Sequence, residues 1–201
     1  YIPEPVTIYE NIYSFPAGCF GFLKNNKLSI KEFDKYNYKP KINKPYKEII
    51  SDVKELFNNS IKRHLISDAP IGTFLSGGLD SSIITAVAAQ YKTDLQTLSL
   101  VFDEKELSEE KYQDLIVKKY NTKHTKYLIN ESLFLDNIDD YFKAMEQPTI
   151  DGLNTYFVSK AAKDNGLTTV LSGVGGDEIF YGYPSFKDGK TLEFLTKIQY
   201  F

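Results

Sequence analysis

Apolar residues recur with two different periods along this chain, and segments of the two kinds alternate from residue 46 onward. Apolar spacing of three and four residues predicts helices over 46–66, 81–91, 108–120, 131–145 and 154–165. Short apolar runs predict strands over 71–75, 95–102, 124–129 and 168–171. Strands that alternate with helices are typical of a parallel sheet covered by helices on both faces. We therefore predict an α/β fold with a doubly wound, mostly parallel sheet.

The first 45 residues follow a different pattern. Three prolines punctuate an extended opening, and short strands are predicted over 19–23 and 28–33, joined by a polar turn. Residues 36–45 are rich in Pro, Lys and Asn, which is typical of a linker. We expect residues 1–45 to be the end of a β domain with its linker, and residues 46–201 to form a second domain.

Two glycine-rich loops carry the polar residues that point to chemistry. The first loop follows the strand at 71–75 and contains Ser76, Gly77, Gly78, Asp80 and Ser81. The second follows the strand at 168–171 and contains Ser172, Gly173, Val174, Gly175, Gly176, Asp177 and Glu178. Ligands of parallel α/β sheets bind beyond the carboxyl ends of the strands. We therefore expect both loops to open at the same edge of the sheet.

The first loop has the form of an anion site. Glycines permit a tight turn, and a helix that starts near Ser81 directs free N–H groups and the positive end of its dipole at one spot. A Mg²⁺ ion could bridge the Asp80 carboxylate to phosphate oxygens, with Asp177 of the second loop as a second carboxylate. The loop lacks the Lys and the spacing of a Walker A loop. The alternatives are an ordinary strand–turn–helix connection and, for the second loop, a turn with solvated acids.

Composition narrows the range of partners. The 201 residues are 42% hydrophobic and 25% charged, which supports a buried core. The net charge is −3 and the chain has no long basic run, so nucleic-acid binding is not expected. A single cysteine, Cys19, argues against a disulfide framework or a Cys-based metal site. No apolar run reaches membrane-spanning length and no signal peptide is visible, so a soluble, cytoplasmic protein is expected.

Both loops carry motifs that resemble the signatures of one family. Residues 75–82 read LSGGLDSS, and residues 171–186 read LSGVGGDEIFYGYPSF. These motifs are similar to those in the synthetase domain of glutamine-hydrolysing asparagine synthases, within the ATP-pyrophosphatase (PP-loop) superfamily and its adenine-nucleotide α-hydrolase fold. The segment 146–161 and the opening 1–18 also resemble that family. The resemblance therefore covers nearly the whole chain.

The resemblance implies a carbon–nitrogen ligase that uses ATP and Mg²⁺. A carboxylate, aspartate in most of the family, is adenylated with release of pyrophosphate, and ammonia from glutamine then forms the amide. Homodimers are one assembly that the resemblance implies. The implied ATP-binding residues are Leu75, Ser76, Gly77, Gly78, Asp80, Ser81, Leu100, Ser172 and Gly173. Asp80 and Asp177 are implied to bind Mg²⁺, Asp80, Asp177 and Glu178 to be catalytic, and Glu109 to lie near the phosphates.

Two residues depart from the family pattern beside the second loop. Val174 stands where many members carry Asp or Glu, and Tyr181 replaces a usual Gly. These departures suggest a related amidotransferase of a surface-polysaccharide or secondary-metabolite pathway that acts on another acid. A degenerate, non-catalytic nucleotide-binding module is a further alternative. A PP-loop enzyme acting on tRNA would favour basic patches or catalytic cysteines, and the sequence offers neither.

The ends of the sequence suggest a fragment of a longer protein. Tyr1 stands where the resemblance would place the N-terminal Cys nucleophile of a glutaminase, so we do not expect this piece to hydrolyse glutamine. Residues 192–201 are predicted to begin a helix, and the late catalytic Lys of the family would lie beyond Phe201.

Overall fold

A computed structural model describes residues 2–34, 43–103, 108–186 and 189. The chain divides into two compact units. One unit comprises residues 1–54 and 132–156, and the other comprises residues 55–131 and 157–201. The predicted domain boundary at residue 45 stays a prediction. Most of the predicted linker at 36–45 and the whole predicted helix at 192–201 lie outside the described residues.

The first unit contains a β-hairpin. Strands β1 (Cys19–Lys24) and β2 (Lys27–Glu32) pair antiparallel, and the register ends with Lys24 opposite Lys27. The two residues between them, Asn25 and Asn26, have φ values of 51° and 57°, as a tight two-residue hairpin turn requires. The predicted hairpin is therefore confirmed, with each strand one residue longer toward the turn. The same unit holds nearly all of helix α4 (Glu131–Ala144).

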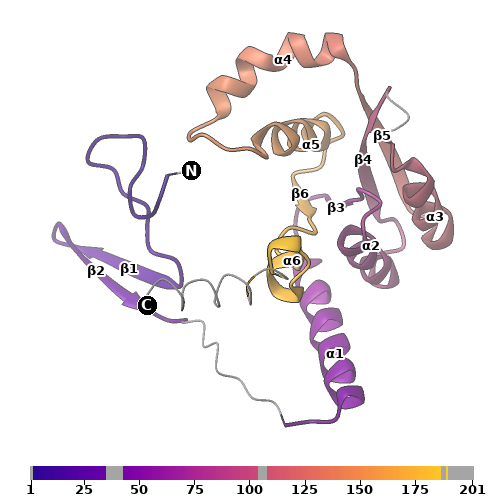
Figure 1. Cartoon of the computed structure of the whole chain (residues 1–201), viewed down its shortest axis with the longest axis horizontal. Coiled ribbons are helices and arrows are strands. Elements are labelled where there is room, and N and C mark those ends of the chain that lie inside the picture. Colours follow the sequence, from indigo (N-terminus) through magenta and orange to yellow (C-terminus); the bar gives the residue numbers. More distant parts are fainter. Residues whose placement is uncertain (1, 35–42, 104–107, 187–188, 190–201) are drawn as a thin grey trace, which may run out of the picture. The chain divides into compact units, whose positions relative to one another are not determined.

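The second unit is built on a four-stranded parallel sheet (Figure 1). Its strands are β3 (Ile71–Phe74), β4 (Gln96–Phe102), β5 (Lys123–Ile129) and β6 (Thr169–Leu171). Their order is β5-β4-β3-β6, and every neighbouring pair is parallel. The central strand β3 is almost wholly buried, which explains why its sequence is apolar without alternation. The predicted parallel sheet is confirmed.

Helices cover both faces of this sheet, as predicted. The other helices are α1 (Tyr46–His64), α2 (Leu79–Tyr91), α3 (Glu110–Tyr120), α5 (Gly152–Asp164) and α6 (Gly176–Phe180). On β5, Lys126 forms an ion pair with Asp114 of α3, whereas the next residue, Tyr127, donates a hydrogen bond to Asp164 of α5. Successive strand residues point to opposite faces. Helices α3 and α5 therefore lie on opposite sides of the sheet.

The apolar core joins α1 and α2 to the sheet. Ile61 of α1 packs with Val87 and Ala88 of α2 and with Leu95, and all four are buried. A hydrogen bond of 2.9 Å between the hydroxyls of Thr73 and Thr85, both fully buried, ties β3 to α2. Helix α2 is thereby fixed on the strand that precedes it. The first loop connects these two elements, so both of its ends are held.

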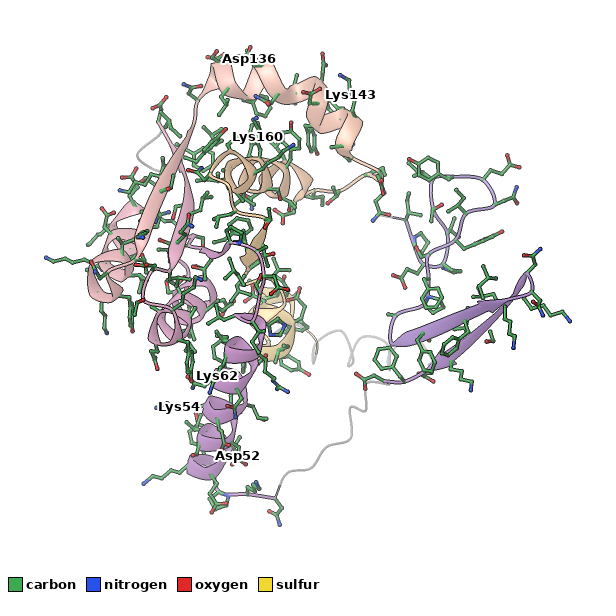
Figure 2. All side chains as sticks on the ribbon, turned by 180° about the vertical axis from the view of Figure 1, so that it is seen from behind. Asp52, Lys54, Lys62, Asp136, Lys143 and Lys160 are labelled. Carbon is green, nitrogen blue, oxygen red and sulfur yellow. The ribbon has the colours of Figure 1, made fainter. Side chains whose placement is uncertain are left out.

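Charged side chains lie along the outer surfaces of the helices. Helix α1 has Glu48 in its first turn and Lys62, Arg63 and His64 in its last turn, an arrangement that complements the helix dipole. Asp52 and Lys62 are seen along this helix in Figure 2. No helix in the described part of the chain combines the length and the apolar composition that a membrane crossing requires.

The observed boundaries differ from the predicted ones in three instructive places. Helix α2 begins at Leu79 rather than residue 81, so Asp80 belongs to its first turn. Helix α3 begins at Glu110, and Ser108 accepts a hydrogen bond from the Glu110 N–H at 3.4 Å. The prediction that the second glycine loop runs without helix to residue 178 is wrong, because the short helix α6 begins inside it at Gly176.

Candidate functional site

The two glycine loops emerge side by side from the carboxyl edge of the sheet. The chain proceeds from β3 to β4 and β5 in one direction, while β6 lies on the other side of β3. In the register of β3 and β6, Thr73 lies opposite Leu171, shortly before the loops that begin at Ser76 and Ser172. This is a topological switch point, where open α/β sheets form a crevice for ligands. The expectation that both loops open at one edge is confirmed.

Internal hydrogen bonds hold the first loop in shape. The Ser81 hydroxyl accepts a hydrogen bond from the Ser76 N–H at 3.2 Å and lies 2.9 Å from the Ser76 hydroxyl. It also donates to the Gly78 carbonyl at 3.2 Å, and the Gly78 N–H donates to the Ser76 hydroxyl at 3.2 Å. Gly77 has a φ of 97°, which a side chain would disfavour. The loop is therefore pre-organised around two serines and one left-handed glycine.

Helix α2 starts directly after this loop. Its cap residue is Gly78, and no side chain caps the helix with a hydrogen bond. The first N–H groups of a helix have no partner within the helix, and the helix dipole adds positive potential there. Asp80, half-buried, is the acidic residue of this first turn. The arrangement suits an anion whose negative charge is shared with a cation beside Asp80.

The second loop rests directly on Asp80. A Cβ atom added to Gly176 would lie 2.5 Å from Asp80 Oδ2, which is closer than real Cβ contacts. A Cβ added to Gly173 would lie 3.1 Å from Asp80 Cβ and 3.2 Å from the Ser81 backbone N. Two glycines thus permit an approach that larger residues would block. The structure brings together Asp80, Ser81, Gly173 and Gly176 from segments about ninety residues apart in sequence.

The acids of the second loop lie on α6. Asp177 is half-buried, its carboxylate lies against Gly182, and its carbonyl accepts a hydrogen bond from the Gly182 N–H at 3.0 Å. Glu178 is exposed and accepts a hydrogen bond from the Tyr183 hydroxyl at 2.8 Å. Gly176, which touches the Asp80 carboxylate, immediately precedes Asp177 in the chain.

The donor set fits Mg²⁺ that is held jointly with phosphate. Among the described residues, no group of three or more His, Cys, Asp or Glu could hold a metal by itself. Mg²⁺ is commonly bound through one or two carboxylates plus substrate phosphates and water, so it does not need such a cage. Asp80 lies at the contact between the two loops, and Asp177 follows the contacting Gly176 in sequence, with its carboxylate against Gly182.

The other predicted residues lie around this junction. Leu75 is fully buried beneath the first loop; its N–H donates to the Leu98 carbonyl at 2.8 Å, and its carbonyl accepts from the Ser99 hydroxyl. Leu100 is half-buried on β4, two residues beyond Leu98, which pairs with Phe74 at the end of β3. In the second loop, the Ser172 hydroxyl accepts a hydrogen bond from the Val174 N–H at 3.3 Å. Ligand contacts of these residues stay predictions.

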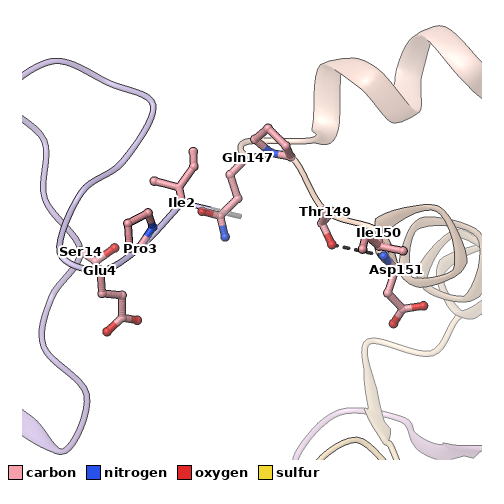
Figure 3. A pocket seen from close by; sticks show the side chains of 9 residues that line it. Ile2, Pro3, Glu4, Ser14, Gln147, Thr149, Ile150 and Asp151 are labelled. Atoms are coloured by element: carbon pink, nitrogen blue, oxygen red, sulfur yellow. Dashed lines mark hydrogen bonds between the residues drawn. The ribbon is translucent and has the colours of Figure 1, made fainter. Parts of the chain in front are cut away.

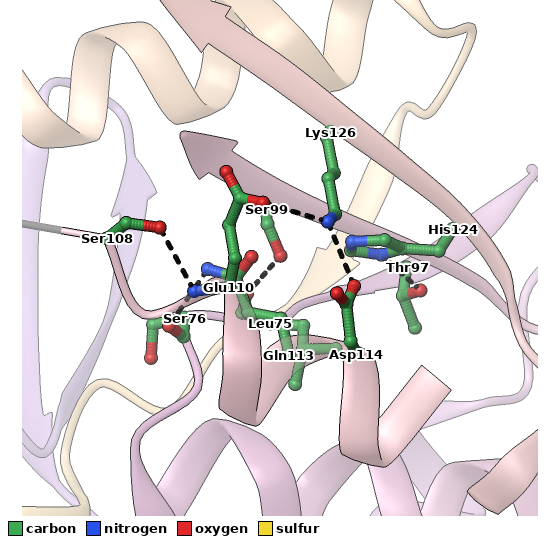
Figure 4. A network of polar contacts seen from close by, with 10 residues as sticks. All are labelled: Leu75, Ser76, Thr97, Ser99, Ser108, Glu110, Gln113, Asp114, His124 and Lys126. Carbon is green, nitrogen blue, oxygen red and sulfur yellow. Dashed lines mark hydrogen bonds and ion pairs between the residues drawn. The ribbon is translucent and has the colours of Figure 1, made fainter. Parts of the chain in front are cut away.

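The start of α3 packs against the first loop, and Glu109 is the only residue of this contact that the sequence had suggested. A Cβ added to Gly77 would lie 3.1 Å from Glu109 Cβ and 3.3 Å from Tyr112 Cβ, so the loop packs on the start of α3. Gln113 of α3, also missed, is buried and donates a hydrogen bond to the Ser76 carbonyl at 3.1 Å (Figure 4). A glutamine within an amphipathic helix gives no sequence signal of such a contact, because the same residue is common on exposed helix faces.

Two ion pairs hold α3 on the sheet. Lys126 Nζ of β5 lies 2.9 Å from Asp114 Oδ1 and 3.1 Å from Glu110 Oε2, both on α3 (Figure 4). The hydrogen bond to Asp114, supported by Glu110, raises the pKa of Lys126. Nearby, His124 Nδ1 lies 2.9 Å from the Thr97 hydroxyl. Burial, with a smaller effect of Lys126, lowers the pKa of His124.

A pocket also occurs in the first unit, and none of the predicted site residues line it. Its volume is about 810 Å³ (Figure 3). It is lined by Ile2, Pro3, Glu4, Ser14, Gln147, Pro148, Thr149, Ile150 and Asp151. Within it, the Thr149 hydroxyl accepts a hydrogen bond from the Asp151 N–H at 3.3 Å. The lining contains no glycine and none of the residues of the two glycine loops.

Comparison with known proteins gives consistent family matches. The sequence pattern of the asparagine synthase family matches residues 52–198. A Methanocaldococcus jannaschii protein named as glutamine-hydrolyzing asparagine synthetase 2 is 35% identical, and the match covers 100% of this chain and 40% of that protein. Glutamine-hydrolyzing asparagine synthetase 1 of Bacillus subtilis is 28% identical, with 98% of this chain and 32% of that protein covered. The chain thus spans less than half the length of these relatives.

Two solved structures show a weaker likeness. The NH3-dependent NAD synthetase from Campylobacter jejuni aligns with a TM-score of 0.42 and 16% identity, over 70% of this chain and 61% of its own. An NMN synthetase from Francisella tularensis aligns with a TM-score of 0.40 and 16% identity, over 62% and 53%.

Proposed function

The chain belongs to the asparagine synthase family, and on this premise we propose that it supplies the ATP site of an amide-forming ligase. The proposed reaction activates a carboxylate with ATP and then joins it to ammonia derived from glutamine. Aspartate is the proposed acceptor, with asparagine as the product. The whole reaction is proposed for the longer protein, of which this chain is the ATP-handling part.

One observation carries the proposal: the second glycine loop contacts Asp80 at the N-terminus of α2. The contact between Gly176 and Asp80 joins two loops that each follow a parallel strand at the switch point. A generic strand–turn–helix connection does not require a second glycine loop to pack on its only acid. Two loops that close on one carboxylate are suited to a polyphosphate and its cation.

Each residue of the junction has a proposed role. The backbone of Gly77 and Gly78 and the first turn of α2 bind the pyrophosphate portion of ATP, while the hydroxyls of Ser76 and Ser81 hold that backbone in place. Leu75, Leu100, Ser172 and Gly173 form the adenosine side of the site. Asp80 and Asp177 hold Mg²⁺, which when bound neutralises negative charge on the phosphates. Glu178, bonded to Tyr183, supports the α6 side of the junction.

The chemistry explains why no side-chain nucleophile is required. A carboxylate does not react directly with ammonia, because oxide is a poor leaving group. In the first step, a carboxylate oxygen of the acceptor forms a bond to the α-phosphorus of ATP, and the bond to pyrophosphate breaks. In the second step, the ammonia nitrogen attacks the acyl carbon, AMP leaves with its oxygen, and the nitrogen loses a proton to solvent. The protein aligns the reacting groups and stabilises developing charge.

A second candidate is the same reaction on a less polar acid. Val174 is 88% exposed in the second loop, where it offers no charge to an acceptor. Tyr181 ends α6 with a φ of 58°, and its ring lies 4.9 Å from the ring of Phe186. A left-handed tyrosine is uncommon, and such conformations are found more often at functional sites. The exposed aromatic residues favour an acceptor that carries an apolar group.

The proposal is tested with the full-length protein that contains this chain. It is incubated with ATP, Mg²⁺, ammonia and either aspartate or one of a series of apolar carboxylic acids, and the nucleotide products are separated. Formation of AMP and pyrophosphate that depends on the acid supports the adenylating ligase and identifies its acceptor. Formation of ADP and phosphate would refute adenylation. ATP binding without turnover on any acid would favour a nucleotide-binding module.

A further inference from the structure

Gln113 stands out because a polar side chain is buried against the back of the first loop. Only 2% of its surface is exposed, although it lies on a helix whose other residues are mostly exposed or half-buried. Its Nε2 donates a hydrogen bond of 3.1 Å to the Ser76 carbonyl, across 37 positions of sequence. Figure 4 shows this side chain reaching from α3 to the loop. Burial of an amide is unfavourable unless its polar atoms find partners.

Only one half of this amide is satisfied by the described residues. Gln113 Oε1 is buried and has no hydrogen-bond partner among them. Exchange of the oxygen and nitrogen would place an oxygen against the Ser76 carbonyl, which is also an acceptor, so the donating orientation is the favourable one. The position therefore keeps a buried polar group at a cost that an apolar residue would avoid. That cost is reasonable if the bond to Ser76 has a role of its own.

The hydrogen bond fixes more than one atom of the loop. A peptide unit is planar and trans, so the Ser76 carbonyl and the Gly77 N–H point in opposite directions. Because Gln113 draws the carbonyl toward α3, the Gly77 N–H is turned away from α3. Within the described residues, this N–H has no hydrogen-bond partner.

The helix that carries Gln113 is itself anchored. Lys126 of β5 bridges Glu110 and Asp114, one turn apart on α3. Glu109 and Tyr112 pack against Gly77 at the start of the same helix. The sheet thus holds α3 in place, and the hydrogen bond from Gln113 in turn fixes the Ser76–Gly77 peptide relative to α3.

We propose that Gln113 is a positioning residue that aims the Gly77 N–H at the phosphates of the bound nucleotide. The inference rests on the proposed function, because it assumes that the first loop receives ATP. Gln113 does not contact the nucleotide itself; it acts through the Ser76–Gly77 peptide. Loss of its N–H donor would let this peptide rotate, so nucleotide affinity would fall while the acceptor acid would bind as before.

Two variants of the full-length protein test the donor, and a third is the control. Gln113→Met keeps the length and burial but removes the N–H. Gln113→Glu removes it only while the carboxylate is ionised, because a protonated carboxyl can donate to the Ser76 carbonyl. Gln90→Met changes a glutamine on α2 that is exposed and donates to Ala86 of its own helix. Thermal unfolding of all variants checks that they are folded.

We expect the variants to change the KM for ATP without changing the KM for the acceptor acid. Gln113→Met raises the KM for ATP roughly three- to tenfold, as expected for one hydrogen bond, and leaves the KM for the acceptor within about twofold. Burial beside a carbonyl raises the pKa of an introduced carboxyl, so Gln113→Glu recovers toward wild-type ATP affinity as the pH is lowered. Gln90→Met behaves as wild type. A KM for ATP unchanged in Gln113→Met, or a Gln113→Glu to wild-type ratio that does not vary with pH, would overturn the inference.

Failure of the proposed function would be recognised separately. If the wild-type protein forms no pyrophosphate with any acid, the ligase proposal fails, and direct MgATP binding by calorimetry then decides on Gln113. Weaker MgATP binding by Gln113→Met than by wild type and Gln90→Met would still support the positioning role. Equal binding by all three, or no MgATP binding by wild type, would overturn it.

Discussion

The contact between Gly176 and Asp80 predicts an unusual effect of a single added methyl group. Gly176 is the first residue of α6 and does not have a positive φ, so alanine suits its backbone. The added Cβ would nevertheless lie 2.5 Å from Asp80 Oδ2 and 2.7 Å from Asp80 Cγ. The substitution Gly176→Ala should therefore displace the Asp80 carboxylate while the protein remains folded.

The magnitude follows from the distances. Ordinary van der Waals contacts of a Cβ begin near 3.4 Å, so the Asp80 carboxylate must move by about 0.9 Å to relieve the 2.5 Å contact. Asp80 has a side chain that can rotate, so the free energy of unfolding should change by no more than about 1 kcal/mol. A carboxylate displaced by nearly 1 Å would be poorly placed for the Mg²⁺ that Asp80 is proposed to hold, because Mg²⁺ tolerates little departure from its preferred ligand positions. Misplacement of this size in a site can cost about a hundredfold in activity.

Gly175→Ala is the matched control, one residue earlier. Gly175 has a φ of 96°, and no atom lies within 4 Å of its ideal Cβ position. Alanine there is strained by roughly 1–2 kcal/mol but does not touch Asp80. We expect Gly175→Ala to lower the thermal midpoint, with a smaller effect on MgATP binding. Gly176→Ala should instead leave the thermal midpoint nearly unchanged and weaken MgATP binding strongly. Thermal unfolding and calorimetric titration with MgATP measure the two effects.

A double-variant cycle provides the refutation. In an Asp80→Ala background the carboxylate is gone, so Gly176→Ala should cause little further loss of MgATP binding. If Gly176→Ala weakens binding equally with and without the Asp80 carboxylate, the loss does not act through Asp80. If Gly176→Ala binds MgATP as tightly as wild type, the contact does not define the site. Either result would refute the reasoning about the loop junction.

Three further predictions concern the supports of the site. Ser81→Ala removes the hydroxyl at the centre of the first loop and should raise the KM for ATP about tenfold, measured by initial rates; an unchanged KM would show that the loop keeps its shape without it. Thr85→Val leaves the buried Thr73 hydroxyl unpaired and should destabilise the fold by about 1–2 kcal/mol in urea unfolding, with partial recovery when Thr73 is also changed to Val. Burial and Lys126 lower the pKa of His124 below 6.5, so near that pH the unfolded chain binds a proton that the native chain does not. The free energy of unfolding should therefore fall as the pH drops below about 6.5 toward the native pKa. His124→Asn should weaken this pH dependence in urea unfolding at several pH values, and an unchanged dependence would contradict the prediction.

Much of the architecture was accessible from the sequence because local signals agreed with the tertiary structure. The buried run at Ile71–Phe74 and the glycines after it specify a strand and a turn, whichever elements surround them. Since parallel strands present their carboxyl ends at one edge, two such turns predict a shared site even without knowledge of the strand order. The sequence alone does not specify that β6 lies next to β3, which is what makes the two loops neighbours.

The parts that could not be predicted depend on contacts between distant segments. Helix α6 begins with Gly176 and Asp177, which have low intrinsic helix propensity, so the local signal indicates a loop. The burial of Gln113 arises only because α3 packs on a loop that precedes it by more than thirty residues. The residues that form the ion pairs between Lys126 and α3 cannot be told from ordinary surface charges in the sequence.

The glycines of the second loop suggest how such a site can keep its use of ATP while its acceptor changes. Gly173 and Gly176 face Asp80, and any larger side chain at either position would press on that residue. Val174 lies between them in sequence yet is 88% exposed, so a change there leaves the Asp80 contact intact. The same loop therefore contains two glycines that are constrained by their contact with Asp80 and an exposed position that is free to vary. On this reasoning, Val174→Asp should alter the ranking of acceptor acids while the KM for ATP stays within about twofold, since the new side chain has no contact to disturb. A large loss of ATP affinity with an unchanged ranking of acids would show that Val174 belongs to the nucleotide side instead.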